Sequence, residues 1–314
     1  MKVLCITNMY PTEVDPSAGS FVRDLVEDVR ALDVEIEVLA FDGRKRKRAY
    51  AEAFLELRRA VRGSGVDLVH AHYGVTGALA VGQRRVPVVV TFHGSDTGYV
   101  RWQGRVSWFV ARLSTPIFVS RDGARRLGCL NAAVIPAGVD VDVFRSRPAA
   151  EARAALGWSE RGHYILLPGA RGNPRKGARV FDAVIGEVRR RVLDVNPVSL
   201  EGFSREEVVD VMNAVDVTLM TSEFEGSPVA IKESLACMTP VVSLPVGDVP
   251  ELLVGLPGCE IAPRDPVALA DAVLRALERG GDPGLRRRVE RFSRRHVAKR
   301  TVALYESVLG KVNQ

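Results

Sequence analysis

The stretch from 215 to 238 constrains the fold of this chain most strongly. Val215 to Met220 is an uninterrupted apolar run, which is typical of a buried strand in a parallel sheet. A polar turn follows, and Pro228 to Met238 predicts a helix, with Pro228 at its first position and Ser227 as the N-cap. This order leaves backbone N–H groups at the carboxyl end of the strand, where anionic ligands bind in open α/β sheets.

The same order of elements recurs along the chain, which predicts an α/β fold. At 314 residues, the chain has room for two domains of about 150 residues each. Apolar runs separated by helical patterns are typical of doubly wound sheets. The predicted strands are 2–7, 34–41, 67–71, 87–91 and 115–120, then 163–168, 215–220, 240–244 and 259–262.

Two carboxylates bracket the polar turn. Glu225 lies in the turn, and Glu233 lies five residues into a helix that is apolar on both faces and therefore buried. A buried carboxylate without donors costs several kcal/mol, on the order of magnitude known for isolated buried charges. Ligand hydroxyls would satisfy Glu233, and so would a core arginine or a backbone N–H, and the sequence leaves these alternatives open.

A glycine-rich basic loop follows the strand at 163–168. It runs from Gly169 to Gly177 and precedes a helix, so backbone N–H groups, Arg171 and Lys176 can converge on a diphosphate. The loop lacks the G-x-x-x-x-G-K-[ST] pattern of a Walker loop. A solvated turn is the alternative interpretation, and Arg175 is expected to face solvent.

Histidines end two neighbouring strands of the first half. His72 and His93 each precede a glycine turn, at the edge of the sheet where ligands bind. The alternative is a buried histidine whose nitrogens are both bonded, which we favour for His72. Asp96 is expected to cap a turn or, as the second possibility, to contact an acceptor. No metal site is predicted, because the histidines lie on different strands and no carboxylate cluster completes a ligand set.

Several motifs together resemble one enzyme family. The spacing Glu-x7-Glu from Glu225 to Glu233, with Gly-Ser-Pro inside it, resembles the retaining nucleotide-sugar glycosyltransferases of family 4. The runs Glu233 to Ser243, Val246 to Glu251 and Thr91 to Asp96 are similar to that family as well. The resemblance implies the GT-B fold, with two Rossmann-like domains facing a central cleft. The implied parts are an acceptor domain at 1–146, a nucleotide-sugar domain at 147–291, and helices at 292–314 whose last member crosses back to the first domain.

The resemblance also implies roles for single residues. Glu225 would reach the hydroxyls of the donor sugar, Glu233 the ribose, and His93 the sugar near its reacting carbon. Arg171 and Lys176 match the family's diphosphate pair, and with the Gly226–Val229 amides they would stabilise the leaving nucleotide. The implied catalytic residues are His93, Arg171, Lys176 and Glu225, the donor-binding residues are Gly19, Ser20, Gly226, Ser227, Pro228, Val229 and Glu233, and the acceptor candidates are His72, Asp96, Arg44, Lys45 and Arg46.

Three places depart from the family pattern. Ser20 stands where the family's glycine loop often has a second glycine, and Ala137 stands where the end-of-domain signature usually has asparagine. The segment 192–202 is shorter than usual, which bears on how the nucleotide base is covered.

A compact basic run, Gly43 to Arg48, precedes a helix at 49–62. Its five cations are consistent with a solvated helix start, or with contact to anionic lipid or a lipid-diphosphate acceptor. Nucleic acid is not an expected partner, because no aromatic residues interleave the charges.

Composition and charge further limit the class of protein to which the chain can belong. No run of 18 or more apolar residues is present, the net charge is +6, and the four cysteines lack metal-type spacing. The start of the chain has the pattern of a strand and not of a signal peptide, so we expect a cytoplasmic protein, with the inner face of the membrane as an open alternative. A dinucleotide oxidoreductase is disfavoured because the first loop has no G-x-G-x-x-G.

The expected function is therefore metal-independent transfer of a sugar, with retention, from a nucleotide-diphosphate sugar to an acceptor hydroxyl of a glycan, lipid-linked or small molecule. No cofactor is expected beyond the donor substrate. The alternatives are an inverting GT-B enzyme or epimerase, and a non-catalytic nucleotide-sugar or carbohydrate-binding protein.

Overall fold

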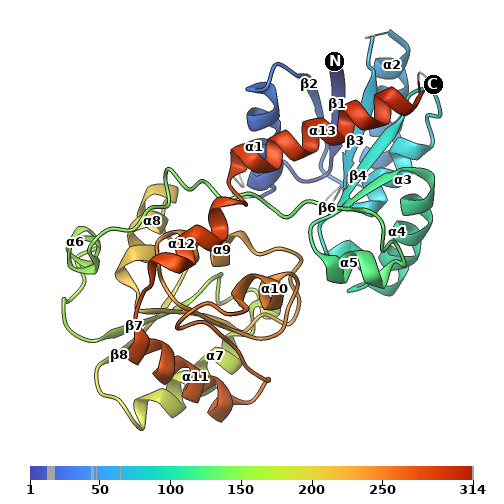
Figure 1. Ribbon diagram of the computed structural model, residues 1–314. Helices are drawn as coiled ribbons and strands as arrows, with labels where there is room; N and C mark the ends of the chain where they lie inside the picture. Colours follow the sequence, from blue (N-terminus) through green and yellow to red (C-terminus); the bar gives the residue numbers. More distant parts are fainter. Residues whose placement is uncertain (13–17, 44–45, 47, 64, 313–314) are drawn as a thin grey trace. The chain divides into compact units, whose positions relative to one another are not determined.

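The computed structural model of the protein describes residues 1–12, 18–43, 46, 48–63 and 65–312. The chain forms two compact units (Figure 1). The first contains Met1–Gly138 and the segment that begins at Arg294, and the second is Val139–Ser293. The boundaries expected from the sequence, at 146 and 291, thus differ from those of the units, which change at 138 and 293.

The first unit is built on a parallel sheet in the order β2-β1-β3-β4-β5-β6. The strand order reverses between β1 and β3, which makes their carboxyl ends the expected ligand edge. The strands are β1 Lys2–Thr7, β2 Glu35–Ala40, β3 Leu68–His72, β4 Val88–Phe92, β5 Thr115–Phe118 and β6 Ala133–Val134. The helices are α1 Ser20–Arg30, α2 Arg48–Gly63, α3 Gly74–Val81, η1 Ser95–Thr97, α4 Arg101–Leu113, α5 Arg121–Arg126 and α13 Arg294–Val312.

Alternate residues of β1 supply two separate apolar cores, one on each face of this sheet. Leu4 and Ile6 pack in the cluster that contains residues of α2, α3 and α4. Val3 and Cys5 pack in the cluster that contains residues of α1 and α13. This is the pattern of a doubly wound sheet, in which a strand buried on both faces is apolar throughout.

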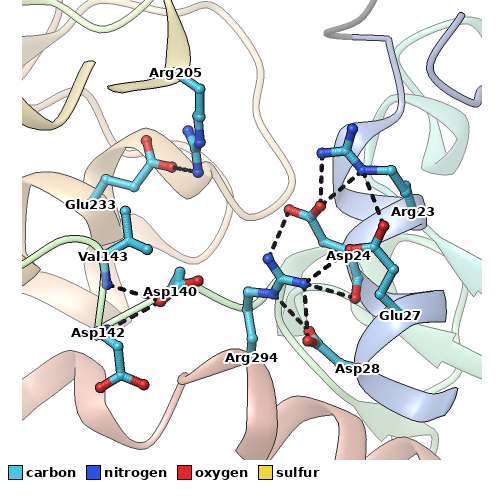
Figure 2. A network of polar contacts seen from close by, with 10 residues as sticks. All are labelled: Arg23, Asp24, Glu27, Asp28, Asp140, Asp142, Val143, Arg205, Glu233 and Arg294. Carbon is cyan, nitrogen blue, oxygen red and sulfur yellow. Dashed lines mark hydrogen bonds and ion pairs between the residues drawn. The ribbon is translucent and has the colours of Figure 1, made fainter. Parts of the chain in front are cut away.

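The last helix, α13, belongs to the first unit although it follows the second in sequence. Arg294 at its start pairs with Asp28 of α1, with Nε 2.8 Å from Oδ2, and lies within ion-pair distance of Asp24 and Glu27 (Figure 2). Further along, Tyr305 is buried and its hydroxyl lies 2.6 Å from Nδ1 of His70 on β3.

The second unit is also a parallel sheet, in the order β11-β10-β9-β7-β8, around a single large core. Its strand order reverses between β7 and β9. The strands are β7 His163–Leu167, β8 Val195–Ser199, β9 Val217–Met220, β10 Val241–Ser243 and β11 Glu260–Ile261. The helices are α6 Ala149–Ala155, η2 Pro174–Lys176, α7 Ala178–Arg189, α8 Arg205–Ala214, α9 Val229–Ala236, α10 Val249–Leu253, α11 Pro266–Arg279 and α12 Pro283–Glu290.

Candidate functional site

Two loops meet at the point of the second unit where the strand order reverses. The loop after β7 contains the basic residues, and the loop after β9 contains Glu225. Thr221 donates its hydroxyl to the carbonyl of Lys176 at 2.9 Å, and the Glu223 amide donates to the carbonyl of Arg175 at 2.9 Å. Gly177 has φ 71°, and a Cβ there would lie 2.1 Å from the Thr221 carbonyl oxygen. Only glycine therefore fits this close approach of the two loops.

Lys176 and Glu225 form an ion pair across these loops. The Lys176 Nζ lies 2.7 Å from Oε1 of Glu225, and both side chains are largely shielded from solvent. The stem of Lys176 crosses Gly169, where an added Cβ would come within 2.8 Å of the lysine Cδ. Two residues that the sequence assigned to sugar and diphosphate are thus brought together.

The start of α9 differs from the prediction. The helix begins at Val229, Pro228 is its N-cap, and no side chain caps it. The expected cap, Ser227, instead donates its hydroxyl to Asp248 Oδ2 at 2.6 Å. The prediction of a Ser227 cap was wrong because the hydroxyl is taken by a partner distant in sequence. The N-cap Pro228 makes no side-chain hydrogen bond to the first amides of α9, the amides that could meet an anion.

A buried lysine that the sequence analysis missed lies behind this loop. Lys232 is fully buried on α9, and its ammonium donates to Ser227 Oγ and lies 3.3 Å from Asp248 Oδ2. Burial lowers the pKa of Lys232, and the Asp248 carboxylate partly offsets this by raising it. The signal available in the sequence was a lysine inside an otherwise apolar helix.

The loop 246–248 also fixes the donor loop through the backbone. The Asp248 amide donates to the Gly226 carbonyl at 3.1 Å. Gly247 has φ 55°, and a Cβ there would lie 2.3 Å from that same carbonyl oxygen. Glycine is therefore required at 247 for the close approach of the two loops.

Glu233 forms an ion pair with an arginine from the surface. Its carboxylate is 4% exposed, and Oε1 lies 2.7 Å from Nη2 of Arg205, whose side chain is 57% exposed (Figure 2). Arg205 is the first residue of α8, directly after the N-cap Ser204. Of the alternatives left open for Glu233, the structure therefore contains an arginine partner, although not one from the core.

Arg171 is engaged elsewhere. Its Nη2 lies 2.5 Å and 2.7 Å from the two carboxylate oxygens of Asp182 on α7, and both side chains are exposed. The expected convergence of Arg171 with Lys176 on one point is therefore not present in this structure, because an acidic partner one turn into α7 holds the guanidinium.

Histidines gather at the point of the first unit where the strand order reverses. His72 Nδ1 lies 3.0 Å from His93 Nε2, and the His72 ring also packs on His70 with 4.4 Å between centroids. His70 is bonded to Tyr305 and, through Nε2, to Thr91 Oγ1 at 2.8 Å. The prediction of a His72 with both nitrogens bonded was wrong: within the described ranges, its Nε2 has no hydrogen-bond partner.

Burial keeps these histidines neutral. It lowers the pKa of His70 to about 3 and the pKa values of His72 and His93 far below their usual range. His93 is only half-buried, and its ring also contacts Phe21 at the start of α1 and Tyr73, with centroid distances of 4.8 and 4.7 Å. His93 is therefore the member of the cluster that a ligand can reach.

The remaining candidates of the first unit lie in turns around this cluster. Asp96 is buried and accepts from the amides of Gly74 at 2.9 Å and Gly94 at 3.0 Å, which is the turn-capping role. Burial raises its pKa to about 6 against the opposing effect of those amides. Gly19, the N-cap of α1, has φ 68°, and a Cβ there would meet the Met9 carbonyl oxygen at 2.3 Å. Ser20 opens α1 directly before the Phe21 that touches His93.

The basic run of the first unit is only partly described. Arg46 pairs with Glu52 at 3.3 Å, whereas Arg44, Lys45 and Lys47 lie outside the described residues. In the part of the chain that the structure describes, no group of three or more His, Cys, Asp or Glu is placed to hold a metal ion. None of the described helices has the length and apolar character to cross a bilayer.

Two family models match the chain, one in each unit. The model of glycosyltransferase family 4 matches residues 17–143, and that of glycosyl transferases group 1 matches residues 172–279. The chain belongs to the group 1, family 4 glycosyltransferases.

Relatives of this glycosyltransferase are themselves described as glycosyltransferases. TuaC of Bacillus subtilis, described as a glycosyltransferase of teichuronic acid biosynthesis, is 25% identical over 346 residues, covering 88% of this chain and 89% of TuaC. The MMP α-(1→4)-mannosyltransferase of Mycolicibacterium hassiacum is 38% identical over 121 residues, which cover 35% of this chain and 29% of that enzyme. These matches identify the protein as a glycosyltransferase that uses nucleotide-sugar donors.

Solved structures confirm the GT-B fold of the glycosyltransferase. Sucrose-phosphate synthase from Thermosynechococcus elongatus superposes with a TM-score of 0.76 at 19% identity, covering 99% of this chain and 100% of the other. HepE of Anabaena, in complex with UDP, gives a TM-score of 0.73 at 16% identity, with 98% and 100% covered.

Proposed function

We propose that this glycosyltransferase transfers a sugar from a nucleoside-diphosphate sugar to an acceptor hydroxyl with retention of configuration and without a metal ion. The observation that carries the proposal is the Lys176–Glu225 pair at the reversal point of the second sheet. A cation and an anion side by side match a donor whose diphosphate is anionic and whose sugar carries hydroxyl groups.

The pair also supports an exchange of partners when the donor binds. Phosphate oxygens replace Glu225 as the partner of Lys176, and sugar hydroxyls replace Lys176 as the donors to Glu225. Neither group is left as an unpaired, shielded charge, which would be costly. Lys176 and the uncapped amides of α9 then stabilise the charge that develops on the leaving diphosphate, as fixed donors.

Arg171 joins this site only after it leaves Asp182. The Arg171–Asp182 pair is exposed, and exposed pairs contribute only about 0–1 kcal/mol. A diphosphate offers the guanidinium a stronger, charge-assisted partner, so the exchange is favourable. Arg171 is thus the mobile cation of the proposed site and Lys176 the fixed one.

Retention of configuration is supported by the state of the acids in the first unit. An inverting enzyme needs a general base, and His72 and Asp96 are the candidates from the sequence. His72 is buried. The Asp96 carboxylate is buried and already accepts from two backbone amides. A mechanism in which the leaving phosphate itself assists attack on the same face needs no such base.

The acceptor and donor are proposed from the relatives. HepE is described in complex with UDP and with UDP-glucose, and TuaC is described by teichuronic acid biosynthesis. We therefore propose a UDP-sugar donor and a glycan or lipid-linked acceptor of polysaccharide biosynthesis.

The test is a donor screen followed by analysis of the product. UDP-, GDP- and ADP-sugars are compared by thermal shift, because a ligand at a hundred times its dissociation constant stabilises by about 2.7 kcal/mol. The stabilising donor is then incubated with a panel of acceptors in the presence of EDTA, and the new linkage is read by NMR. We expect the anomeric configuration of the donor in the product. An inverted linkage would refute retention, and transfer abolished by EDTA would refute metal independence.

A further inference from the structure

One helix of the first unit exposes large apolar side chains that its core does not need. On α4, Ser107, Val110 and Ala111 are buried, whereas Trp102, Phe109 and Leu113 are 56%, 57% and 54% exposed. Trp108 on the same helix, Tyr99 just before it and Leu130 are exposed as well. Several large apolar residues on one helix mark an interaction surface, whereas isolated ones are ordinary.

The exposed residues of α4 form an ordered face. Trp102, Phe109 and Leu113 are spaced seven and four residues apart, which places them on one stripe of the helix. Arg101, Arg105 and Arg112 are also exposed, and the helix contains no acidic residue. The Arg112 guanidinium lies over the Trp108 ring, 3.7 Å from its centroid. The solvent side of α4 is therefore both aromatic and basic.

The fold holds this face in place. An added Cβ at Gly74 of α3 would lie 1.9 Å from Ser107 Oγ, and one at Gly77 would lie 2.8 Å from Val110 Cγ1. Two glycines of α3 therefore let the buried side of α4 approach closely. The aromatic side is consequently presented by a packed helix rather than by a loop.

We propose that the face of Trp102, Phe109 and Leu113, with the flanking arginines of α4, docks on a bilayer that contains anionic lipids. Tryptophan and tyrosine favour the interface of membranes, and arginines attract anionic headgroups. A helix with a basic, aromatic face lies in the plane of such an interface. A second copy of this chain is the poorer partner, because a two-fold interface would set the arginines of α4 against the same arginines.

The position of α4 connects membrane docking with the transfer reaction. This connection rests on the proposed lipid-linked acceptor. Three residues separate the helix from η1, whose Asp96 holds the turn directly following His93. Docking α4 would therefore bring the accessible histidine of the first unit near lipid headgroups. The basic run at 44–48 is less suited, since Leu55, a large exposed apolar residue of α2, lies in sequence between the exposed acids Glu52 and Glu56.

Vesicle binding by the full chain tests the proposal. Cosedimentation is measured with vesicles of phosphatidylcholine alone and with vesicles that also contain phosphatidylglycerol, whose anionic headgroups attract basic helices. We expect binding only to the anionic vesicles. In a Trp158→Phe background, only Trp102 and Trp108 remain to emit, and their emission should shift to the blue on binding. Equal binding to both vesicle types, or none to either, overturns the proposal.

Matched variants locate the surface. The double variant Trp102→Ser/Phe109→Ser should bind anionic vesicles roughly tenfold more weakly or worse, because two large apolar groups are lost. Leu55→Ser, an exposed apolar residue on α2, should bind like the wild type. Unchanged binding by the double variant, or a wild-type dimer that the double variant abolishes in the absence of vesicle binding, would assign α4 to another partner.

A readout in solution separates this inference from the proposed function. Transfer to a water-soluble acceptor should be unchanged in the double variant, whereas transfer to an acceptor embedded in vesicles should fall with binding. Loss of transfer to both acceptors would mean that the face belongs to the site itself, and would overturn docking. If the wild type transfers to neither acceptor but binds vesicles, the proposed function fails and the docking surface stands.

Discussion

The two units share one architecture but prepare their ligand edges differently. At the reversal point of the second sheet, the candidate residues are charged and paired, as Lys176–Glu225, Arg205–Glu233 and Lys232–Asp248. At the reversal point of the first sheet, His70, His72 and Asp96 are buried and His93 is half-buried. Burial lowers the pKa values of the three histidines and raises the pKa of Asp96 to about 6, which favours the neutral form of each. An edge of exchangeable ion pairs suits a charged nucleotide donor, whereas an edge of neutral donors and acceptors suits sugar hydroxyls. The difference indicates that the same fold is adapted by local burial and pairing.

The largest effect is expected from removing the buried cation of the second unit, Lys232. Lys232→Met should lower the free energy of unfolding by about 3–5 kcal/mol, because the Asp248 carboxylate is left buried without its cation. Urea unfolding followed by circular dichroism measures the loss. The double variant Lys232→Met/Asp248→Asn should recover part of it, and a double variant as unstable as the single one would show that the charge pair is not the cause.

Removal of the fixed cation of the proposed site should have the next largest effect. Lys176→Ala is expected to lower kcat about 10²–10³-fold, the usual cost of one donor that stabilises developing charge. Arg175→Ala is the matched control: the residue is exposed, and its backbone carbonyl, which the Glu223 amide uses, is retained. Equal activity of the two variants in a transfer assay would count against the diphosphate role of Lys176.

Acidification tests whether the histidines at the ligand edge of the first sheet are neutral in the folded protein. Because the pKa of His70 falls to about 3 on folding, the unfolded chain binds a proton between that value and about 6.5 that the folded protein does not. Stability should therefore fall as the pH drops from 7 to 5, by about 2 kcal/mol for this residue alone. His72 and His93 act in the same direction, and Asp96, whose pKa is raised to about 6, acts in the opposite one.

Unfolding free energies across this pH range test the sign of that linkage. His70→Gln should flatten the dependence of stability on pH, since it removes one proton-binding group from the unfolded chain. A wild type that gains stability on acidification would show that the histidines are not held neutral.

The smallest effects are expected on the KM for donor, when Glu233 and its surface partner Arg205 are replaced separately. Glu233→Gln is expected to raise the KM for donor about tenfold with little change in kcat, because a hydrogen bond to a charged group contributes about 1.5–3 kcal/mol to binding. Arg205→Gln should change KM by less than about threefold, since we expect a ribose bound at Glu233 to displace its exposed guanidinium. A larger effect of Arg205→Gln than of Glu233→Gln would mean that the ion pair is the functional unit.

The sequence predicted the local features of the fold well, because local rules decide them. The apolar run at 215–220 depends on residues close in sequence, and the structure contains a strand there, β9, which begins at Val217. Lys176 and Glu225 could be chosen because each lies in a loop between a predicted strand and a predicted helix, and because the motifs around them resemble those of family 4. Their direct contact depends on the strand order, which no single motif encodes.

Long-range partners account for what the sequence could not supply. Ser227 is a reasonable helix cap by local rules, yet Asp248 takes its hydroxyl. Arg171 is a reasonable phosphate ligand, yet Asp182 on the next helix holds it. Lys232 was missed because a lysine is ordinarily a surface residue, and only the buried partners Ser227 and Asp248 make its position stable.

The return of α13 has a consequence for synthesis of the protein on the ribosome. Val297, Ala298 and Tyr305 complete one core of the first unit, and the chain translates them only after the whole second unit. Domains that are continuous in sequence can fold in the order in which they emerge. In this chain the first unit emerges first but is completed last, so a nascent chain that stops before Arg294 leaves an apolar face of its sheet uncovered.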